Sequence, residues 1–282
     1  MENANEEIAF QAQIRTKMAE GYENYTCADY DMPSTEPAST HTWYYNRVRR
    51  EVNVYLNRAA SKIHLVKNFI SPEECDAMGK AAERTLHRAT VADGKGGSEL
   101  SPSRKAMQAG IKIPWHKESE GDPLTTISRK VYDYVNHVLD LDIKENGQED
   151  LMSIQYFGRG EGDEEPDRYT PHCDGDCNGM KFKPGNRMAT MVMYCTIPKK
   201  GGATNFRNSG IHIVPEAGSA TFFSYINPET MTMDNKFTEH SGCPVIEGEK
   251  KIVTQWVRYG VDDENPWDSF NTLGIKNSDM AD

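Results

Sequence analysis

The sequence predicts an α+β fold in which helices come first along the chain and strands come second. Before residue 150, apolar side chains recur at helical spacing behind two clear helix-start signals. From residue 151 onward, short β-prone runs follow one another, punctuated by Gly, Pro and Asn, without helical periodicity. Many short strands separated by turns are typical of a sandwich, a jelly roll or a barrel. We therefore expect one composite core built by helices and strands together.

The N-terminal region is expected to be helical with a linker. Residues 5–20 can form a helix, whereas residues 21–42 are rich in Asp, Ser, Thr and Pro and predict a loop or linker. Residues 47–62 resume a helical pattern, because apolar side chains recur there at the spacing of one helix face: Val48, Val52, Leu56 and Ala59.

Two further helices have recognisable first turns. After a short strand at residues 63–70, a helix begins at Ser71, where the run Ser-Pro-Glu-Glu supplies an N-cap, Pro at N1 and Glu at N3. The next begins at Asp122 and carries an apolar face of Leu124, Ile127, Val131, Val135 and Val138. Residues 94–104, which are polar and rich in Gly and Ser, predict a loop. Strands are expected at 151–157, 188–197, 203–206, 211–214, 219–225 and 251–258.

Composition and charge disfavour several classes of function. The 282 residues are 37% hydrophobic and 27% charged, which is ordinary for a soluble globular protein. The net charge is −11 and the acidic residues are dispersed, which disfavours nucleic acid and anionic membranes as partners, because both require basic patches. A basic or neutral polypeptide substrate remains compatible with this charge.

The sequence predicts neither membrane insertion nor secretion. The first ten residues, MENANEEIAF, are acidic and lack the apolar stretch of a secretory signal. The longest nearly apolar run, residues 188–197, is about half as long as a membrane span. The six cysteines are too few for a disulfide scaffold in a chain of this length.

A candidate metal site is centred on His172 and Asp174. In an extended segment, residues i and i+2 point the same way, so these two side chains can converge on one ion. A second histidine from elsewhere would complete two histidines and one carboxylate, a set that leaves positions on the ion open. Oxygen chemistry requires such positions, two for a chelating cosubstrate and one for dioxygen. A His-x-Asp triplet alone also occurs by chance in surface turns.

Two other metal interpretations of this stretch remain open. The run that begins at Asp174 matches the opening of an EF-hand calcium loop, but its twelfth position is Gly185, where a bidentate Glu is needed. Cys173 and Cys177 could form half of a zinc site with His172, although no second Cys/His pair has suitable spacing.

The downstream sequence favours iron. His240 is followed by a Cys-Pro-Val-Ile run and, ten residues after the histidine, by Lys250. A fixed cation near an open iron site can pair with the distal carboxylate of a 2-oxo diacid whose keto acid end chelates the metal. Alone, Lys250 would be a strand-edge charge. Its spacing from His240 indicates instead a site with His172, Asp174 and His240 as ligands and Lys250 as the counter-charge.

With these residues identified, residues 62–260 resemble the catalytic domain of prolyl 4-hydroxylase alpha subunits. The family's blocks occur in order and at similar spacing: Phe69-Ile70-Ser71-Pro72-Glu73-Glu74, Leu86-His87-Arg88-Ala89-Thr90-Val91, Tyr169-x-Pro171-His172-x-Asp174, Ala189-Thr190-Met191, Gly201-Gly202-Ala203-Thr204, and His240-x-x-Cys243-Pro244-Val245 with Lys250 and Trp256. The chain then divides into a helical and linker extension (1–61), an oxygenase domain (62–260) and an acidic C-terminal tail (261–282).

The resemblance implies a double-stranded β-helix (jelly-roll) core with N-terminal supporting helices. It also implies an Fe(II)- and 2-oxoglutarate-dependent dioxygenase, assisted by L-ascorbate, that converts peptidyl proline in collagen-like or other proline-rich polypeptides to 4-hydroxyproline. Succinate and CO2 would be released. The three metal ligands would hold the iron. Lys250 would bind the C5 carboxylate of 2-oxoglutarate, and Tyr156 and Thr204 stand where the family places its hydrogen-bonding partners.

The resemblance also places five residues in a polypeptide groove. Tyr169, Arg187 and Trp256 occupy the positions of peptide-contacting residues, and Glu149 and Arg104 align with other groove residues. An aromatic slot suits proline-rich peptides in an extended, polyproline-II-like shape. A core role for Trp256 is the alternative.

The chain also departs from the family. The insertion 158–168 is expected to reshape the rim of the groove, and the later cysteine that usually pairs with the one at Cys243 is missing. The family's dimerisation and peptide-binding parts are reduced to at most residues 1–61, which weakens the expectation of a partnership with protein disulfide isomerase. The resemblance implies the endoplasmic reticulum lumen, whereas the N-terminal sequence leaves the cytoplasm as the alternative.

Three functional hypotheses follow. The first is a prolyl 4-hydroxylase, and the second is an oxygenase with the same chemistry that acts on another protein or a small molecule. The third is a non-catalytic peptide-binding subunit. Such subunits typically lose a metal ligand or the cosubstrate lysine, and this sequence retains both.

Overall fold

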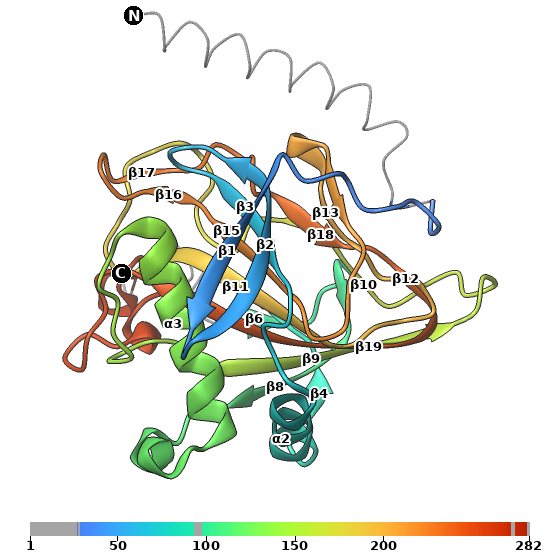
Figure 1. Ribbon diagram of the computed structural model, residues 1–282, viewed down its shortest axis with the longest axis horizontal. Coiled ribbons are helices and arrows are strands. Elements are labelled where there is room, and N and C mark those ends of the chain that lie inside the picture. Colours follow the sequence, from blue (N-terminus) through green and yellow to red (C-terminus); the bar gives the residue numbers. More distant parts are fainter. Residues whose placement is uncertain (1–26, 28, 93–97, 272–273, 281–282) are drawn as a thin grey trace, which may run out of the picture.

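Two antiparallel β-sheets form the body of the protein, and two helices pack against the larger one (Figure 1). The computed structural model describes residues 27, 29–92, 98–271 and 274–280. The large sheet runs in the order β1 (Ser39–Tyr45), β2 (Val48–Asn57), β3 (Lys62–Val66), β15 (Ala220–Ser224), β11 (Arg187–Thr196), β19 (Val245–Arg258), β9 (Leu151–Arg159), β8 (Met107–Ile111) and β4 (His87–Arg88), with β12 (Lys200–Gly201) on β19.

The small sheet carries two of the candidate metal ligands, His172 and His240. It runs in the order β14 (Ile211–Ile213), β13 (Thr204–Phe206), β18 (His240–Gly242), β10 (Arg168–His172) and β7 (Arg104–Lys105). The remaining strands of the described residues form two small two-stranded sheets: β5 (Val91–Ala92) with β6 (Ser98–Glu99), and β16 (Ile226–Asn227) with β17 (Thr232–Met233). The two-sheet arrangement confirms the expectation of a sandwich or jelly roll.

The two described helices begin where the sequence predicts. Helix α2 (Pro72–Ala82) has Ser71 as its N-cap, and Ser71 and Glu74 form a reciprocal capping box. Helix α3 (Pro123–Leu139) begins after Asp122, whose carboxylate accepts two backbone N–H groups. Short 3-10 helices are η1 (Trp115–Glu120), η2 (Arg207–Ser209), η3 (Trp267–Ser269) and η4 (Asn277–Met280). The helix expected at residues 5–20 lies outside the described residues.

The prediction of a helix at residues 47–62 is wrong, because most of this segment forms strand β2. Burial alternates along β2, with Arg50, Val52 and Val54 inward and their neighbours less buried, which is the period of a strand. Residues Asn46 and Arg47 have positive φ and make the tight turn of the β1–β2 hairpin. The apolar positions at i and i+4 fit both periods, and pairing with β1 and β3 favours the strand.

Strands expected in the second half are confirmed at β9, β11, β13, β14 and β15, and β19 extends further toward the N-terminus than expected. Strands β10 and β18 were not predicted, because they are short and contain Pro, His and Gly. Strands β1 and β2 join the same sheet as β3, so the proposed boundary at residue 61 runs between hydrogen-bonded strands. Among the described residues, none of the helices is long and apolar enough to cross a membrane.

Val54→Asp distinguishes the strand from the expected helix. Val54 is 3% exposed, so an unpaired carboxylate there is expected to lower the free energy of unfolding by about 4 kcal/mol. Val48→Asp is the matched control in the same strand, because Val48 is 54% exposed. It should change stability by less than about 0.5 kcal/mol. Urea unfolding measures both, and a helix that buries Val48 would make Val48→Asp the severe change.

Candidate active site

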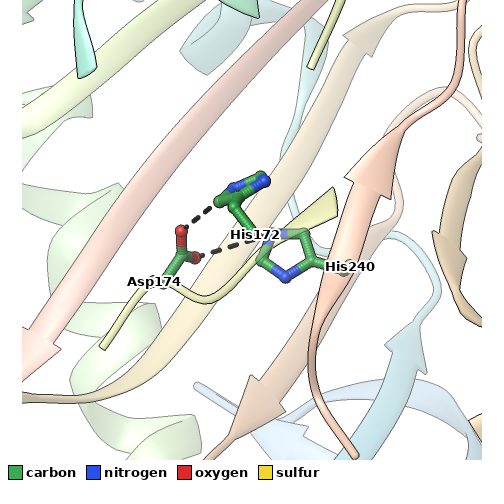
Figure 2. Close-up of side chains that lie close together, drawn as sticks. All are labelled: His172, Asp174 and His240. Carbon is green, nitrogen blue, oxygen red and sulfur yellow. Dashed lines mark ion pairs between the residues drawn. The ribbon is translucent and has the colours of Figure 1, made fainter. Parts of the chain in front are cut away.

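The pairing of β10 with β18 brings the predicted metal ligands together. His172 and His240 are direct partners across these two strands, and Asp174 lies just beyond the end of β10. Asp174 Oδ1 is 3.4 Å from His172 Nε2, and Asp174 Oδ2 is 3.8 Å from His240 Nε2. Figure 2 shows the carboxylate directed toward both imidazoles. The three ligand atoms lie within 4.8 Å of one another, which is close enough to hold one metal ion.

Backbone carbonyls orient both imidazoles for metal binding. His172 Nδ1 donates to Thr170 O at 2.8 Å, and His240 Nδ1 donates to Thr238 O at 3.0 Å. Because the proton sits on Nδ1, the neutral ring keeps its Nε2 lone pair for a metal. Burial lowers the pKa of His240 to about 4, so this ring is neutral near pH 7.

Asp174 is held in its ionised form. Burial alone would raise its pKa, but the imidazoles of His240 and His172 hold that pKa well below its usual range. Thr190 on β11 donates to Asp174 Oδ2 at 2.7 Å and fixes the orientation of the carboxylate. The sequence assigned no role to Thr190, because nothing in one sequence places β11 beside the metal loop.

Lys250 is a buried cation on the large sheet that faces the same cavity. It lies on β19 directly across from Tyr156 on β9, and it is 2% exposed. Its Nζ donates to Gly202 O at 2.6 Å, and among the described residues no carboxylate lies within ion-pairing distance. Burial lowers the pKa of Lys250 to about 7. A buried ammonium without an anionic partner fits a site for a ligand carboxylate.

The predicted cosubstrate residues and the metal triad line one cavity between the two sheets. Its walls include Tyr156, Thr204 and Lys250 together with the three ligands. Thr204 Oγ1 lies 2.8 Å from the hydroxyl of Tyr194, which was not predicted to take part. A metal and a small dicarboxylate therefore fit the donors and the cation that these residues present.

The five predicted groove residues lie along a neighbouring cavity of about 430 Å³: Arg104, Glu149, Tyr169, Arg187 and Trp256. The ring of Tyr169 stacks on His172 with 3.5 Å between centroids, and the guanidinium of Arg187 lies 4.0 Å from the ring of Trp256. Glu149 does not present a free carboxylate, because Arg187 and Arg258 both donate to it at 2.6 Å. Its expected contact with a polypeptide stays a prediction.

All six cysteines are paired, and the sequence predicted none of these pairs. The bonds are Cys27–Cys243, Cys75–Cys195 and Cys173–Cys177. The partner of Cys243 lies upstream, whereas the family pattern led us to look downstream. The zinc interpretation is wrong, because a disulfide leaves neither sulfur as a thiolate ligand. The calcium interpretation fails because the Asp174 carboxylate faces two histidines.

The Cys173–Cys177 bond closes the loop on which Asp174 lies, and Cys173 is the residue between two metal ligands. The double variant Cys173→Ser/Cys177→Ser is expected to weaken binding of Mn(II) roughly three- to tenfold, because a freer loop loses more conformational entropy when the metal binds. Anaerobic calorimetric titration measures the affinity.

The control is Cys75→Ser/Cys195→Ser, which removes a disulfide away from the metal cavity. It should lower thermal stability and leave the Mn(II) affinity unchanged. Equal metal affinities in the two double variants and the wild type would show that the loop disulfide does not organise the ligands.

Comparisons with known proteins agree with this geometry. Residues 153–258 match the sequence profile of the 2OG-Fe(II) oxygenase superfamily. The chain is 28% identical over 246 residues to prolyl 4-hydroxylase subunit alpha-1 of Caenorhabditis elegans. The aligned region covers 84% of this chain and 40% of that subunit. It is 30% identical over 213 residues to probable prolyl 4-hydroxylase 4 of Arabidopsis thaliana, with coverages of 68% and 65%. The chain thus spans less than two thirds of each relative.

A solved structure shares the fold. The viral collagen prolyl hydroxylase of Paramecium bursaria Chlorella virus-1, crystallised with 2-oxoglutarate, is 26% identical and superposes with a TM-score of 0.52 over 70% of this chain and 95% of that one. The facing sheets are therefore the double-stranded β-helix that the sequence led us to expect. Profile, fold and converged ligands agree: residues 153–258 match the 2OG-Fe(II) oxygenase superfamily, and His172, Asp174 and His240 lie within this stretch in an arrangement that can hold one metal ion.

Proposed function

We propose that the protein is a prolyl 4-hydroxylase of proline-rich, collagen-like polypeptides. In this reaction O2 and 2-oxoglutarate are consumed, one oxygen atom enters the C4–H bond of a peptidyl proline, and succinate and CO2 leave. The observation that carries the proposal is the shared cavity in which two histidines, one aspartate and a buried lysine converge. Relatives named as prolyl 4-hydroxylases support the choice of substrate.

In this proposal each residue has a distinct task. His172, Asp174 and His240 hold Fe(II), and bound iron supplies the activation of dioxygen. Three protein ligands leave the remaining positions for the cosubstrate and the gas. Lys250 binds the C5 carboxylate of 2-oxoglutarate, and L-ascorbate serves as the accompanying reductant.

Tyr156 and Thr204 are proposed to orient 2-oxoglutarate, since both line the cavity beside Lys250. Burial raises the pKa of Tyr156, so its hydroxyl stays protonated and can donate a hydrogen bond to a carboxylate oxygen. These lining side chains are shielded from solvent, because Tyr156, Thr204 and Lys250 are each less than 5% exposed. A dry cavity strengthens the pairing of the ammonium with the cosubstrate.

The three disulfides support an oxidising compartment such as the endoplasmic reticulum lumen. Paired cysteines that include one between two metal ligands would be unusual in a reducing cytosol. A polypeptide destined for secretion is the matching class of substrate.

Asp174→Ala is expected to abolish turnover and leave a folded protein, because it removes one ligand and its charge. Purified protein is incubated with Fe(II), 2-oxoglutarate, ascorbate and a (Pro-Pro-Gly)-type peptide. Succinate is assayed, and the peptide mass is examined for the gain of one oxygen atom. Asp176→Ala is the matched control, because Asp176 lies in the same loop and outside the ligand group. It should retain activity.

Three outcomes separate the hypotheses. Wild-type protein that yields neither succinate nor hydroxylated peptide would rule out the proposed activity. Succinate release that another acceptor stimulates, without peptide hydroxylation, would favour an oxygenase of that acceptor. Activity that survives Asp174→Ala would show that the metal site is elsewhere.

The lowered pKa of Lys250 predicts that 2-oxoglutarate binding depends on pH. The side chain is protonated below its pKa of about 7 and loses its charge above it. Only the charged form pairs with the carboxylate, so the dissociation constant should rise by up to about tenfold per pH unit between pH 7 and pH 9, with proton uptake on binding. Calorimetric titration of the Mn(II)-loaded protein measures both quantities.

Lys250→Met should weaken binding and remove this slope. Lys251→Met is the matched control, because the adjacent Lys251 is partly exposed and pairs with Glu249 at 3.0 Å. It should keep the wild-type affinity and slope. A wild-type affinity that is constant from pH 7 to pH 9 would count against Lys250 as the carboxylate partner.

A further inference from the structure

The cavity of about 430 Å³ beside the metal site has a wall that the sequence did not predict. It shares Arg104, Tyr169, Asp174 and Trp256 with the metal cavity, so the two cavities are adjacent. Three further lining residues come from the segment after β19: Trp267, Phe270 and Asn271. The acidic C-terminal tail thus forms part of the wall of the cavity beside the metal site.

Arg258 anchors this C-terminal wall, defined as residues 267–271. Arg258 is 1% exposed, and its Nη1 donates to Asn271 O at 2.9 Å and to Gly185 O at 2.6 Å. The other end of the wall is held by the backbone N–H of Trp267, which donates to Gly147 O at 2.8 Å. The wall is therefore attached to the oxygenase core at both ends.

The same cluster that holds the wall also reaches a metal ligand. Glu149 accepts hydrogen bonds from Arg258 and from Arg187, each at 2.6 Å. Arg187 in turn donates to the backbone carbonyl of Asp174 at 3.4 Å and lies over the ring of Trp256. Buried Arg–carboxylate pairs hold defined geometry. The position of the wall relative to the metal is thus set by one Arg–Glu–Arg cluster.

Three buried polar atoms on residues that line this cavity lack a hydrogen-bond partner among the described residues. They are Arg104 Nε and Trp256 Nε1, which are donors, and Gln108 Oε1, which is an acceptor. An unpaired buried donor is costly, so such groups indicate a ligand that supplies acceptors. A polypeptide in the polyproline II conformation has no internal hydrogen bonds and presents free backbone carbonyls.

The two aromatic side chains of the wall have different tasks. Phe270 is 7% exposed and packs closely on Gly185, where an added Cβ would lie 2.4 Å from the Phe270 ring. Phe270 therefore supports the wall. Trp267, at the start of η3, is only partly buried and lines the cavity. Flat indole faces are suited to stacking on pyrrolidine rings.

We propose that the C-terminal wall completes the polypeptide groove, and that Trp267 is a specificity-determining residue that contacts a proline ring next to the hydroxylated one. This inference rests on the proposed function and extends it, because it assigns a binding role to a segment outside the region that resembles the family. The occupant is an extended proline-rich chain, whose pyrrolidine rings offer flat faces for Trp267 to stack on.

The test replaces Trp267 in the full chain and separates peptide binding from cosubstrate use. Trp267→Ala should raise the KM for a (Pro-Pro-Gly)-type peptide about tenfold, because truncating an aromatic contact residue typically has an effect of this size. The KM for 2-oxoglutarate and the succinate formed without peptide should not change. Trp267→Phe should recover most of the peptide affinity, since a phenyl ring can also stack on proline.

Trp115→Ala is the matched control. Trp115 also opens a short 3-10 helix and is partly buried, but it stacks on Tyr132 and does not line the groove. Its replacement should leave the peptide KM unchanged. Binding of a fluorescent peptide to the protein loaded with Mn(II) and 2-oxoglutarate gives a dissociation constant that does not depend on turnover.

The outcomes distinguish the inference from the proposed function. If the wild type hydroxylates the peptide and Trp267→Ala binds it equally well, the wall assignment is overturned and the function stands. If the wild type binds the peptide without hydroxylating it and Trp267→Ala weakens binding, the wall stands and the activity is overturned. If the wild type does not bind the peptide, both are overturned.

Discussion

The register between β10 and β18 is the constraint on which the site depends. Because His172 and His240 are direct partners across β10 and β18, their two imidazoles lie side by side on the small sheet. A shift by one residue would turn either side chain to the opposite face. The backbone carbonyls of Thr170 and Thr238 accept hydrogen bonds from the two rings and so fix their tautomers. Asp174 follows two residues after His172, just beyond the end of β10. The metal set thus results from strand pairing rather than from a preformed loop.

The two sheets bring different chemistry to the same cavity. The small sheet supplies the two histidine ligands and Thr204, whereas the large sheet supplies Lys250, Tyr156, Trp256 and the threonine that orients Asp174. Burial gives each group its character: it lowers the pKa of Lys250 and raises that of Tyr156. Burial disfavours the charged form of Lys250 unless an anion lies beside it, and this is the physical basis of the pairing with 2-oxoglutarate that we propose.

Cross-links and buried ion pairs tie distant segments to this cavity. The Cys27–Cys243 bond joins the N-terminal region to the chain just after β18, and Cys173–Cys177 closes the metal loop. Glu149 joins β11 and β19 through two arginines, and Arg258 extends this link to the C-terminal wall. The regions before and after the family-like stretch are therefore attached to it, the first by a disulfide and the second by hydrogen bonds.

The sequence by itself determined which residues could form the metal centre. Spacing and residue type predicted His172, Asp174 and His240, which the structure brings together, and capping residues located both described helices, because these signals are local. Only the tertiary structure decided that residues 48–57 form a strand, that Cys243 pairs with Cys27, and that Trp267 lies beside the metal cavity. Those features depend on contacts between residues far apart in the chain, and no local pattern encodes which distant segment will be the partner.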